Sequence, residues 1–182
     1  GAGTDLDIQA GTSVTISGAT ILIVNVATGA TGVISGALTM AGAAHRLTAA
    51  DPGGILFASG GSATSSTGFS GNMFGTTSLN SVIFQAGSTY VFNTGANPFG
   101  AANPNAVAVF QAGSLYRHKA VATPSFSGRT YADFELDNAT PATVISATGA
   151  SALSIDNITI LSGSLKFAMT GPFNIKGNVA VN

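Results

Sequence analysis

The sequence predicts an all-β fold: a parallel β-helix of about seven rungs, each rung being one solenoid turn of about 25 residues. The first observation behind this prediction is an internal repeat. Residues 84–90 (Phe-Gln-Ala-Gly-Ser-Thr-Tyr) return as residues 110–116 (Phe-Gln-Ala-Gly-Ser-Leu-Tyr), 26 positions later and identical at six of seven positions. Because parallel crossover connections are overwhelmingly right-handed, we expect a right-handed helix.

The second observation is that the repeat extends through the chain. A short apolar segment ends at each of seven markers, which follow one another at nearly constant intervals: Gly11, Gly36, Gly61, Gly87, Gly113, Asp137 and Gly163. Asp can stand for Gly here because it adopts left-handed backbone more readily than most residues. The spacing predicts one equivalent position per rung.

The third observation is alternation before the markers. The residue three positions earlier is apolar in all seven cases, and the next residue is mostly polar, as strand geometry requires. We therefore expect Phe84, Phe110 and Phe134 to stack in the interior. Gln85 and Gln111 would form an amide ladder outside.

The remaining strands follow from short β-branched and aromatic runs. Residues 13–16, 37–40, 90–92 and 164–167 come after markers, and a less regular third set lies at 21–24, 152–155 and 173–176. Two turn-rich inserts, 97–104 and 120–129, interrupt the pattern. Loops that project from a rigid scaffold often carry function.

Composition narrows the class of protein. Only 7% of the 182 residues are charged, the net charge is −1, and 45% are hydrophobic. Clustered Lys and Arg are needed to bind phosphates, so nucleic acid is excluded as a partner. The longest apolar run, Ile21–Val24, is far too short to insert into a membrane. With no Cys and two His, we expect neither a metal site nor a cofactor.

The whole chain, residues 1–182, is predicted to form one β-helix domain. Strand-like sequence begins near Asp5 and continues to Asn182, without an amphipathic helix to cap either end. Three explanations stay open: a segment of a larger solenoid, an assembly subunit whose terminal rungs pair with other chains or with copies of itself, or ends trimmed by cleavage.

Just over half of the chain, from about Leu79 to Asn182, resembles exported surface proteins of Bacteroidetes bacteria. The segments that carry the resemblance are 87–90, 97–100, 110–117, 124–131 and 155–159. Those proteins are large β-helical substrates of type IX secretion. The resemblance implies an extracellular or cell-surface location in a bacterium, and it implies no reaction.

The candidate binding residues cluster between positions 117 and 137, where six of the charged residues fall. The candidates are Arg117, His118, Lys119, Arg129, Asp133 and Glu135. Carboxylates beside Arg and Lys are used by polysaccharide lyases and hydrolases, with Tyr116 or Tyr131 as a sugar platform. Solvated ion pairs that fix a loop produce the same cluster, with Arg129 pairing Asp133 or Glu135.

The expected function is therefore non-enzymatic: an extracellular stalk, adhesin segment or fibre-forming subunit that associates through exposed terminal rungs. The alternative is a carbohydrate-binding or polysaccharide-degrading β-helix that contacts surface glycans. Ice binding by Thr ladders is a further alternative. Thr15 and Thr39 fall near equivalent positions, but the sequence shows no regular two-column array.

Overall fold

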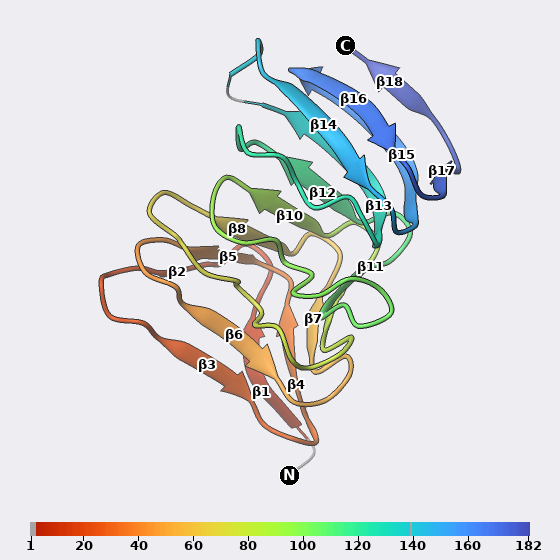
Figure 1. Ribbon diagram of the computed structural model, residues 1–182. Coiled ribbons are helices and arrows are strands. Elements are labelled where there is room, and N and C mark those ends of the chain that lie inside the picture. The colour runs from red at the N-terminus through yellow and green to blue at the C-terminus, as the bar shows by residue number, and fades with distance from the viewer. Residues whose placement is uncertain (1–2, 139) are drawn as a thin grey trace.

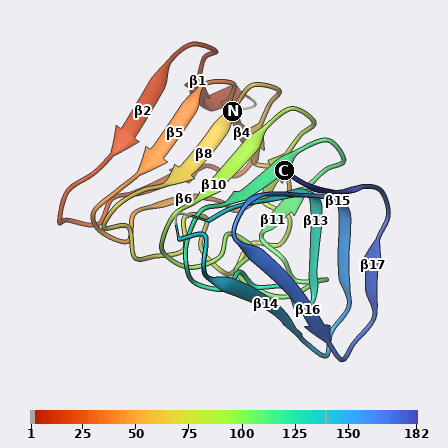
Figure 2. The ribbon, with the colours of Figure 1, turned by 90° about the horizontal axis from the view of Figure 1, so that it is seen from above.

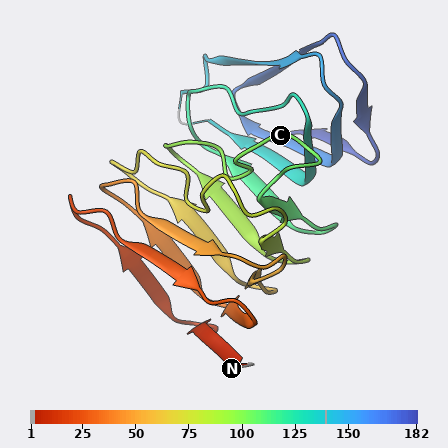
Figure 3. The ribbon, with the colours of Figure 1, turned by 60° about the horizontal axis from the view of Figure 1, so that its bottom comes forward.

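The protein is an all-β solenoid of about seven rungs in a computed structural model that describes residues 3–138 and 140–182. Within these residues no helix is formed. Strands β1 and β18 lie at opposite ends of the stack (Figure 1), and the rungs follow one another along its length (Figure 3). The predicted fold class is confirmed.

The strands are short in the first five rungs. In chain order they are β1 (Gly3–Ile8), β2 (Ser13–Ile16), β3 (Ile23–Val26), β4 (Ala30–Ile34), β5 (Ala37–Met40), β6 (Arg46–Ala49), β7 (Ile55–Phe57), β8 (Ser62–Ser65), β9 (Val82–Phe84), β10 (Thr89–Phe92), β11 (Ala108–Phe110) and β12 (Leu115–His118). Among these rungs only the first two carry a third strand, β3 or β6, and the others have a loop in its place.

The last rungs are built from longer strands until the final one. These strands are β13 (Arg129–Asp137), β14 (Val144–Gly149), β15 (Leu153–Ser162), β16 (Ser164–Met169), β17 (Phe173–Ile175) and β18 (Val179–Val181). Arg129 begins β13, so it is not part of the insert that the sequence placed at residues 120–129.

All strands pair in parallel. A five-stranded sheet has the order β1-β4-β7-β9-β11, and a nine-stranded sheet has the order β17-β15-β13-β12-β10-β8-β5-β2 with β18 also pairing β15. Two small sheets, β3-β6 and β14-β16, cover the third side. The apolar side chains of the alternating strands point into one continuous core.

The repeated motif makes the corner between the two large sheets. Gly87 and Gly113 have φ angles of 79° and 81°, which residues with a Cβ rarely adopt. The hydroxyl of Ser88 donates to the carbonyl of Gln85 at 2.6 Å, and Ser114 does the same to Gln111 at 2.7 Å. At these two corners the motif supplies one left-handed residue and one carbonyl cap, whereas Ser35 and Gly36 turn the β4–β5 corner without a left-handed residue.

An aromatic ladder fills the core beside this corner. Phe57, Phe84 and Phe110 stack face to face, with centroid separations of 4.4 Å and 4.6 Å. Phe134 was expected in this ladder, and that expectation is wrong. It pairs with Tyr116 and stacks on its ring at 5.8 Å, so it belongs to the ladder of Tyr90 and Tyr116.

The outer amide ladder is not formed either. Among the described residues no side-chain hydrogen bond joins Gln85 to Gln111. Their backbone carbonyls accept the corner hydroxyls instead, and their backbone N–H groups donate to Phe57 and Phe84. The feature that recurs at the corner is therefore its backbone geometry.

A change of strand register explains why Phe134 lies in a different ladder from the expected one. Phe84 pairs with Phe110, which keeps the full spacing of the repeat, whereas Leu115 pairs with Asp133 across a clearly shorter stretch of sequence. β13 and β15 are long strands of the nine-stranded sheet that run on without a corner turn. Asp137 is therefore not equivalent to Gly113.

Candidate functional site

Strand alternation brings charged residues together on the outer face of the nine-stranded sheet. We call Arg117, Lys119, Asp133, Glu135 and Asp137 the charged belt. Arg117 pairs in register with Glu135, and its Nε donates to Oε1 of that carboxylate. Lys119 Nζ donates to Asp137 Oδ2 at 2.7 Å. The cations are thus matched with carboxylates of the next rung.

Asp133 carries the belt toward the C-terminal rungs. Its Oδ1 accepts a hydrogen bond from Asn157 Nδ2 at 2.7 Å, and Asn157 Oδ1 accepts one from the Asn178 backbone at 2.9 Å. Asp133 and Asn157 are register neighbours on β13 and β15. The result is a polar relay across three rungs, with no Lys or Arg ion pair to Asp133 among the described residues.

A groove of about 440 Å³ lies along this relay. It is lined by Leu115, Asp133, Phe134, Asn157, Ile158, Thr159, Asn178 and Ala180. Its volume is within the range of small-ligand sites, roughly 300–1,000 Å³. It offers one carboxylate, two side-chain amides and a hydroxyl, groups that can exchange hydrogen bonds with a polar neutral ligand.

His118 does not join the charged belt, because it is one position out of phase and points inward. Its Nε2 lies 2.7 Å from the Ala122 carbonyl, and its ring stacks on Phe92 at 5.2 Å. Burial lowers the pKa of His118 to about 4, although the hydrogen bond to Ala122 acts in the other direction. The imidazole is therefore neutral at pH 7 and belongs to the core.

Arg129 is also buried, and it forms no ion pair with Asp133 or Glu135. Its guanidinium lies 5.4 Å from the Phe99 ring centroid, and Nη1 donates to the Gly128 carbonyl at 3.2 Å. Glu135 forms its ion pair with Arg117, so the expected pairing of Arg129 with Asp133 or Glu135 is wrong. Burial lowers the pKa of Arg129.

The two tyrosines proposed as sugar platforms are inside the solenoid. Tyr116 and Tyr131 are at most 1% exposed, and Tyr131 donates its hydroxyl to the Ser125 carbonyl at 2.6 Å. Neither ring can stack on an external sugar. Of the six candidate residues, Arg117, Lys119, Asp133 and Glu135 share one surface; whether they bind a ligand stays a prediction.

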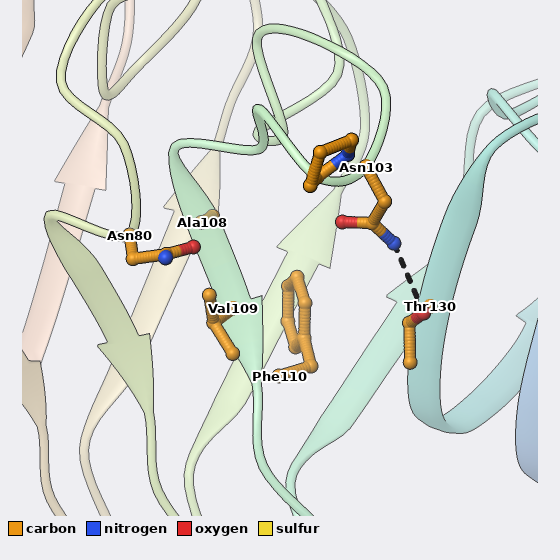
Figure 4. Close-up of a pocket in the computed structure, with 7 residues that line it drawn as sticks. Asn80, Asn103, Ala108, Val109, Phe110 and Thr130 are labelled. Carbon is orange, nitrogen blue, oxygen red and sulfur yellow. Dashed lines mark hydrogen bonds between the residues drawn. The ribbon is translucent and has the colours of Figure 1, made fainter.

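A second pocket lies beside the outer face of β11, as Figure 4 shows. Its volume is about 390 Å³, and it is lined by Asn80, Asn103, Pro104, Ala108, Val109, Phe110 and Thr130. Asn103 Nδ2 donates to Thr130 Oγ1 at 3.0 Å across it. The pocket has an apolar floor and a neutral polar rim.

One partial signal for this pocket is present in the sequence. Asn103 and Pro104 lie in the 97–104 insert, which was expected to project from the solenoid. Asn80 is the one described non-Gly residue with a positive φ, 52°. The pocket itself forms where two loops and the strands β11 and β13, from separate rungs, come together, which no local pattern indicates.

Within the described residues, apolar side chains of the core are exposed at both ends of the solenoid. At the N-terminal end, among the residues whose side chains are described, a small apolar cavity is lined by interior side chains: Leu6, Ile8, Val14, Ile16, Val24, Leu38 and Leu47. Val14 is 40% exposed although its side chain belongs to the core side of β2. At the other end Val179 and Val181 are 57% and 73% exposed.

The described part of the chain holds no group of three or more His, Cys, Asp or Glu side chains suited to a metal ion. It also forms no helix of the length and hydrophobicity needed to span a membrane. The chain matches no protein-family model, no curated protein and no solved structure.

Proposed function

We propose that this chain is a non-enzymatic structural β-solenoid of a bacterial cell surface. It acts as a stalk, adhesin segment or fibre-forming subunit and associates end to end through its terminal rungs. The observation that carries the proposal is the open apolar core at the N-terminal rung, where Leu6, Val14 and Val24 line a cavity with no polar lining. Covering this surface is favoured by the hydrophobic effect.

The C-terminal rung supplies a matching strand edge. Ile158 N–H donates to Asn178 at 2.8 Å, and Asn182 N–H donates to Ile160 at 3.0 Å, so these residues at the two ends of β18 face β15. By strand alternation the N–H groups of Val179 and Val181 point the other way, along the solenoid axis. An edge of this kind can add a further strand.

The test is sedimentation of the full chain over a range of concentrations. We expect concentration-dependent association that is lost in Val181→Pro, which removes an outward N–H without removing a bond to β15. Val181→Ala is the matched control, since it keeps that N–H and should associate like the wild type. Val14→Lys, which places a charge in the open core end, should weaken association from the other side.

Two results would overturn end-to-end association. One is a wild-type chain that stays monomeric at every concentration. The other is association that persists undiminished in both Val181→Pro and Val14→Lys, which would assign it to another surface.

Carbohydrate binding is the second candidate, favoured by the groove that Asp133, Asn157 and Asn178 line. A carboxylate oxygen and amides held in place by the relay are suited to sugar hydroxyls. A glycan array should then give binding that Asp133→Ala abolishes and Asn103→Ala, in the other pocket, leaves unchanged. If Asn103→Ala abolished binding and Asp133→Ala did not, the sugar site would be the pocket of Figure 4. If the wild type bound no glycan at all, carbohydrate binding would be ruled out.

A further inference from the structure

The outer face of the nine-stranded sheet changes character along the solenoid. Its N-terminal part is formed by β2, β5, β8 and β10, which lie side by side in one layer (Figure 2). Their outward residues are Ser13, Thr15, Ala37, Thr39, Ser62, Thr64, Thr89 and Val91, which we call the hydroxyl face. Six of the eight are Ser or Thr, and none is charged or aromatic.

The strands of the hydroxyl face are in register, so these side chains form two straight columns. Thr15, Thr39 and Thr64 are paired successively in one column, which Val91 continues. Ser13, Ala37, Ser62 and Thr89 form the other. No register shift interrupts these three pairings, whereas one occurs between β1 and β4. The sequence did not show this second column, because it is recognisable only from the pairing.

The hydroxyls of this face have no partner within the described part of the chain. Elsewhere the solenoid uses its hydroxyls internally: Thr12, Ser88 and Ser114 each cap a corner carbonyl at 2.6–2.7 Å. The side chains of Thr15, Thr39 and Thr64 form no such bond. Their hydrogen-bonding capacity is directed outward.

The two columns make a regular two-dimensional mesh. Neighbouring strands are about 4.8 Å apart, and alternate residues along a strand are roughly 6.7 Å apart. Thr is β-branched and stiff at χ1, so each hydroxyl and methyl group is held at a fixed position. Such an array can hold water molecules in a repeating pattern, because each hydroxyl supplies one hydrogen-bond donor and two acceptor sites. Each methyl group restricts the positions that the neighbouring water molecules can take.

The chemistry of the face favours a water lattice over a sugar. The face has no aromatic ring to stack on a sugar and no carboxylate or amide. None of its eight residues lines either of the two larger hollows described above. Small-ligand sites are concave, whereas a crystal surface requires an array that repeats in two directions.

We propose that the hydroxyl face binds ice, by holding a layer of water whose order continues into the crystal lattice. This activity is separate from end-to-end association, because the face lies on the side of the solenoid. Thr39 is at its centre, between Thr15 and Thr64.

The test is thermal hysteresis and inhibition of ice recrystallisation by the full chain. We expect activity in the wild type and loss of most of it in Thr39→Tyr, whose ring would stand above the mesh and prevent contact. Thr39→Val keeps the shape of the side chain and removes its hydroxyl, so a partial loss of ice activity would measure the contribution of the hydroxyl apart from that of the shape. Thr148→Tyr, at an exposed position of β14, should keep full activity.

Several outcomes would overturn the proposal: no ice activity in the wild type, or equal loss in Thr39→Tyr and Thr148→Tyr. Binding to insoluble cellulose or chitin that Thr39→Tyr abolishes, without ice activity, would assign the face to polysaccharide instead. An unchanged thermal melt of Thr39→Tyr establishes that the fold is intact. The sedimentation of Thr39→Tyr should match that of the wild type, so ice binding can be disproved without affecting end-to-end association, and the reverse.

Discussion

The first five rungs and the last rungs use the same parallel stacking but differ at one corner. In the first part a turn separates the two large sheets, as between β11 and β12, and in the second part β13 and β15 run through without one. Counting back from the Leu115–Asp133 pair, Tyr131 and Ala132 stand where Gly113 and Ser114 make the turn. At the β11–β12 corner a left-handed glycine and a capping hydroxyl make the turn, and β13 continues as one strand through the equivalent positions, where both are missing.

The two parts also differ in burial and in surface. The first part encloses the stack of Phe57, Phe84 and Phe110, and its outer face is neutral on β2, β5, β8 and β10. The charged belt begins at β12, the last strand of this part, and continues on β13, and the second part has half-buried interior residues such as Phe167. Stability should therefore be unevenly distributed along the solenoid.

The largest expected effect tests this difference in burial. Phe84→Ala removes a fully buried ring between Phe57 and Phe110 and should lower the free energy of unfolding by about 3–5 kcal/mol. Phe167→Ala, in the last rungs, should cost clearly less because that ring is only partly buried. Urea unfolding measures both values. Equal losses would contradict the uneven distribution.

The next effect is a pH dependence located where the two parts meet. His118 has a pKa of about 4 in the fold against an ordinary 6.5, so the unfolded chain binds more protons between these values. The neutral imidazole therefore contributes on the order of 3 kcal/mol to the free energy of unfolding above about pH 6.5, and this contribution is lost as the pH falls toward 4.

The difference between the wild type and His118→Phe isolates this contribution, because carboxylate titration is common to both. Phe can keep the stack with Phe92 and Phe134 but cannot be protonated. The free-energy difference between the two proteins should change across pH 7 to 4. A constant difference would mean that His118 is accessible to protons in the fold.

A smaller effect should come from the corner itself. A Cβ added at Gly61 would clash with the backbone oxygen of Ile34, which cannot move without disturbing its own rung. Gly61→Ala should cost about 1–3 kcal/mol, the usual range for overpacking. Ser62→Ala, one residue on but outward, should stay within about 0.5 kcal/mol. Thermal unfolding of both variants would show whether the corner is as tight as this contact implies.

The smallest effect concerns the charged belt. A double-mutant cycle on Arg117→Ala and Glu135→Ala should give a coupling of about 0.2–1 kcal/mol that weakens with salt, because the Arg117 side chain is 37% exposed. A coupling well above this range, insensitive to salt, would mean that the belt contributes to the stability of the last rungs more than its exposure suggests.

The sequence was sufficient to predict the fold because a corner glycine recurs in each of the first five rungs. The sequence placed Phe134 in the wrong ladder because the spacing from Gly113 to Asp137 is close to that of a full rung. Where the corner is lost, however, fewer residues separate the paired positions of β12 and β13. Partners such as Arg117 with Glu135 follow only from that register. Asn80, in a loop, and Thr130, in β13, line one pocket from separate rungs, which no local pattern encodes.

The position of β1 and β18 at opposite ends of the stack has a mechanical consequence (Figure 1). Tension applied between the ends acts along the inter-strand hydrogen bonds, so strands should peel away one rung at a time, beginning with the exposed β18. A released rung as long as the Phe84–Phe110 repeat would extend the chain by roughly 85–95 Å. Under load the solenoid would behave as an extensible tether that absorbs work in steps.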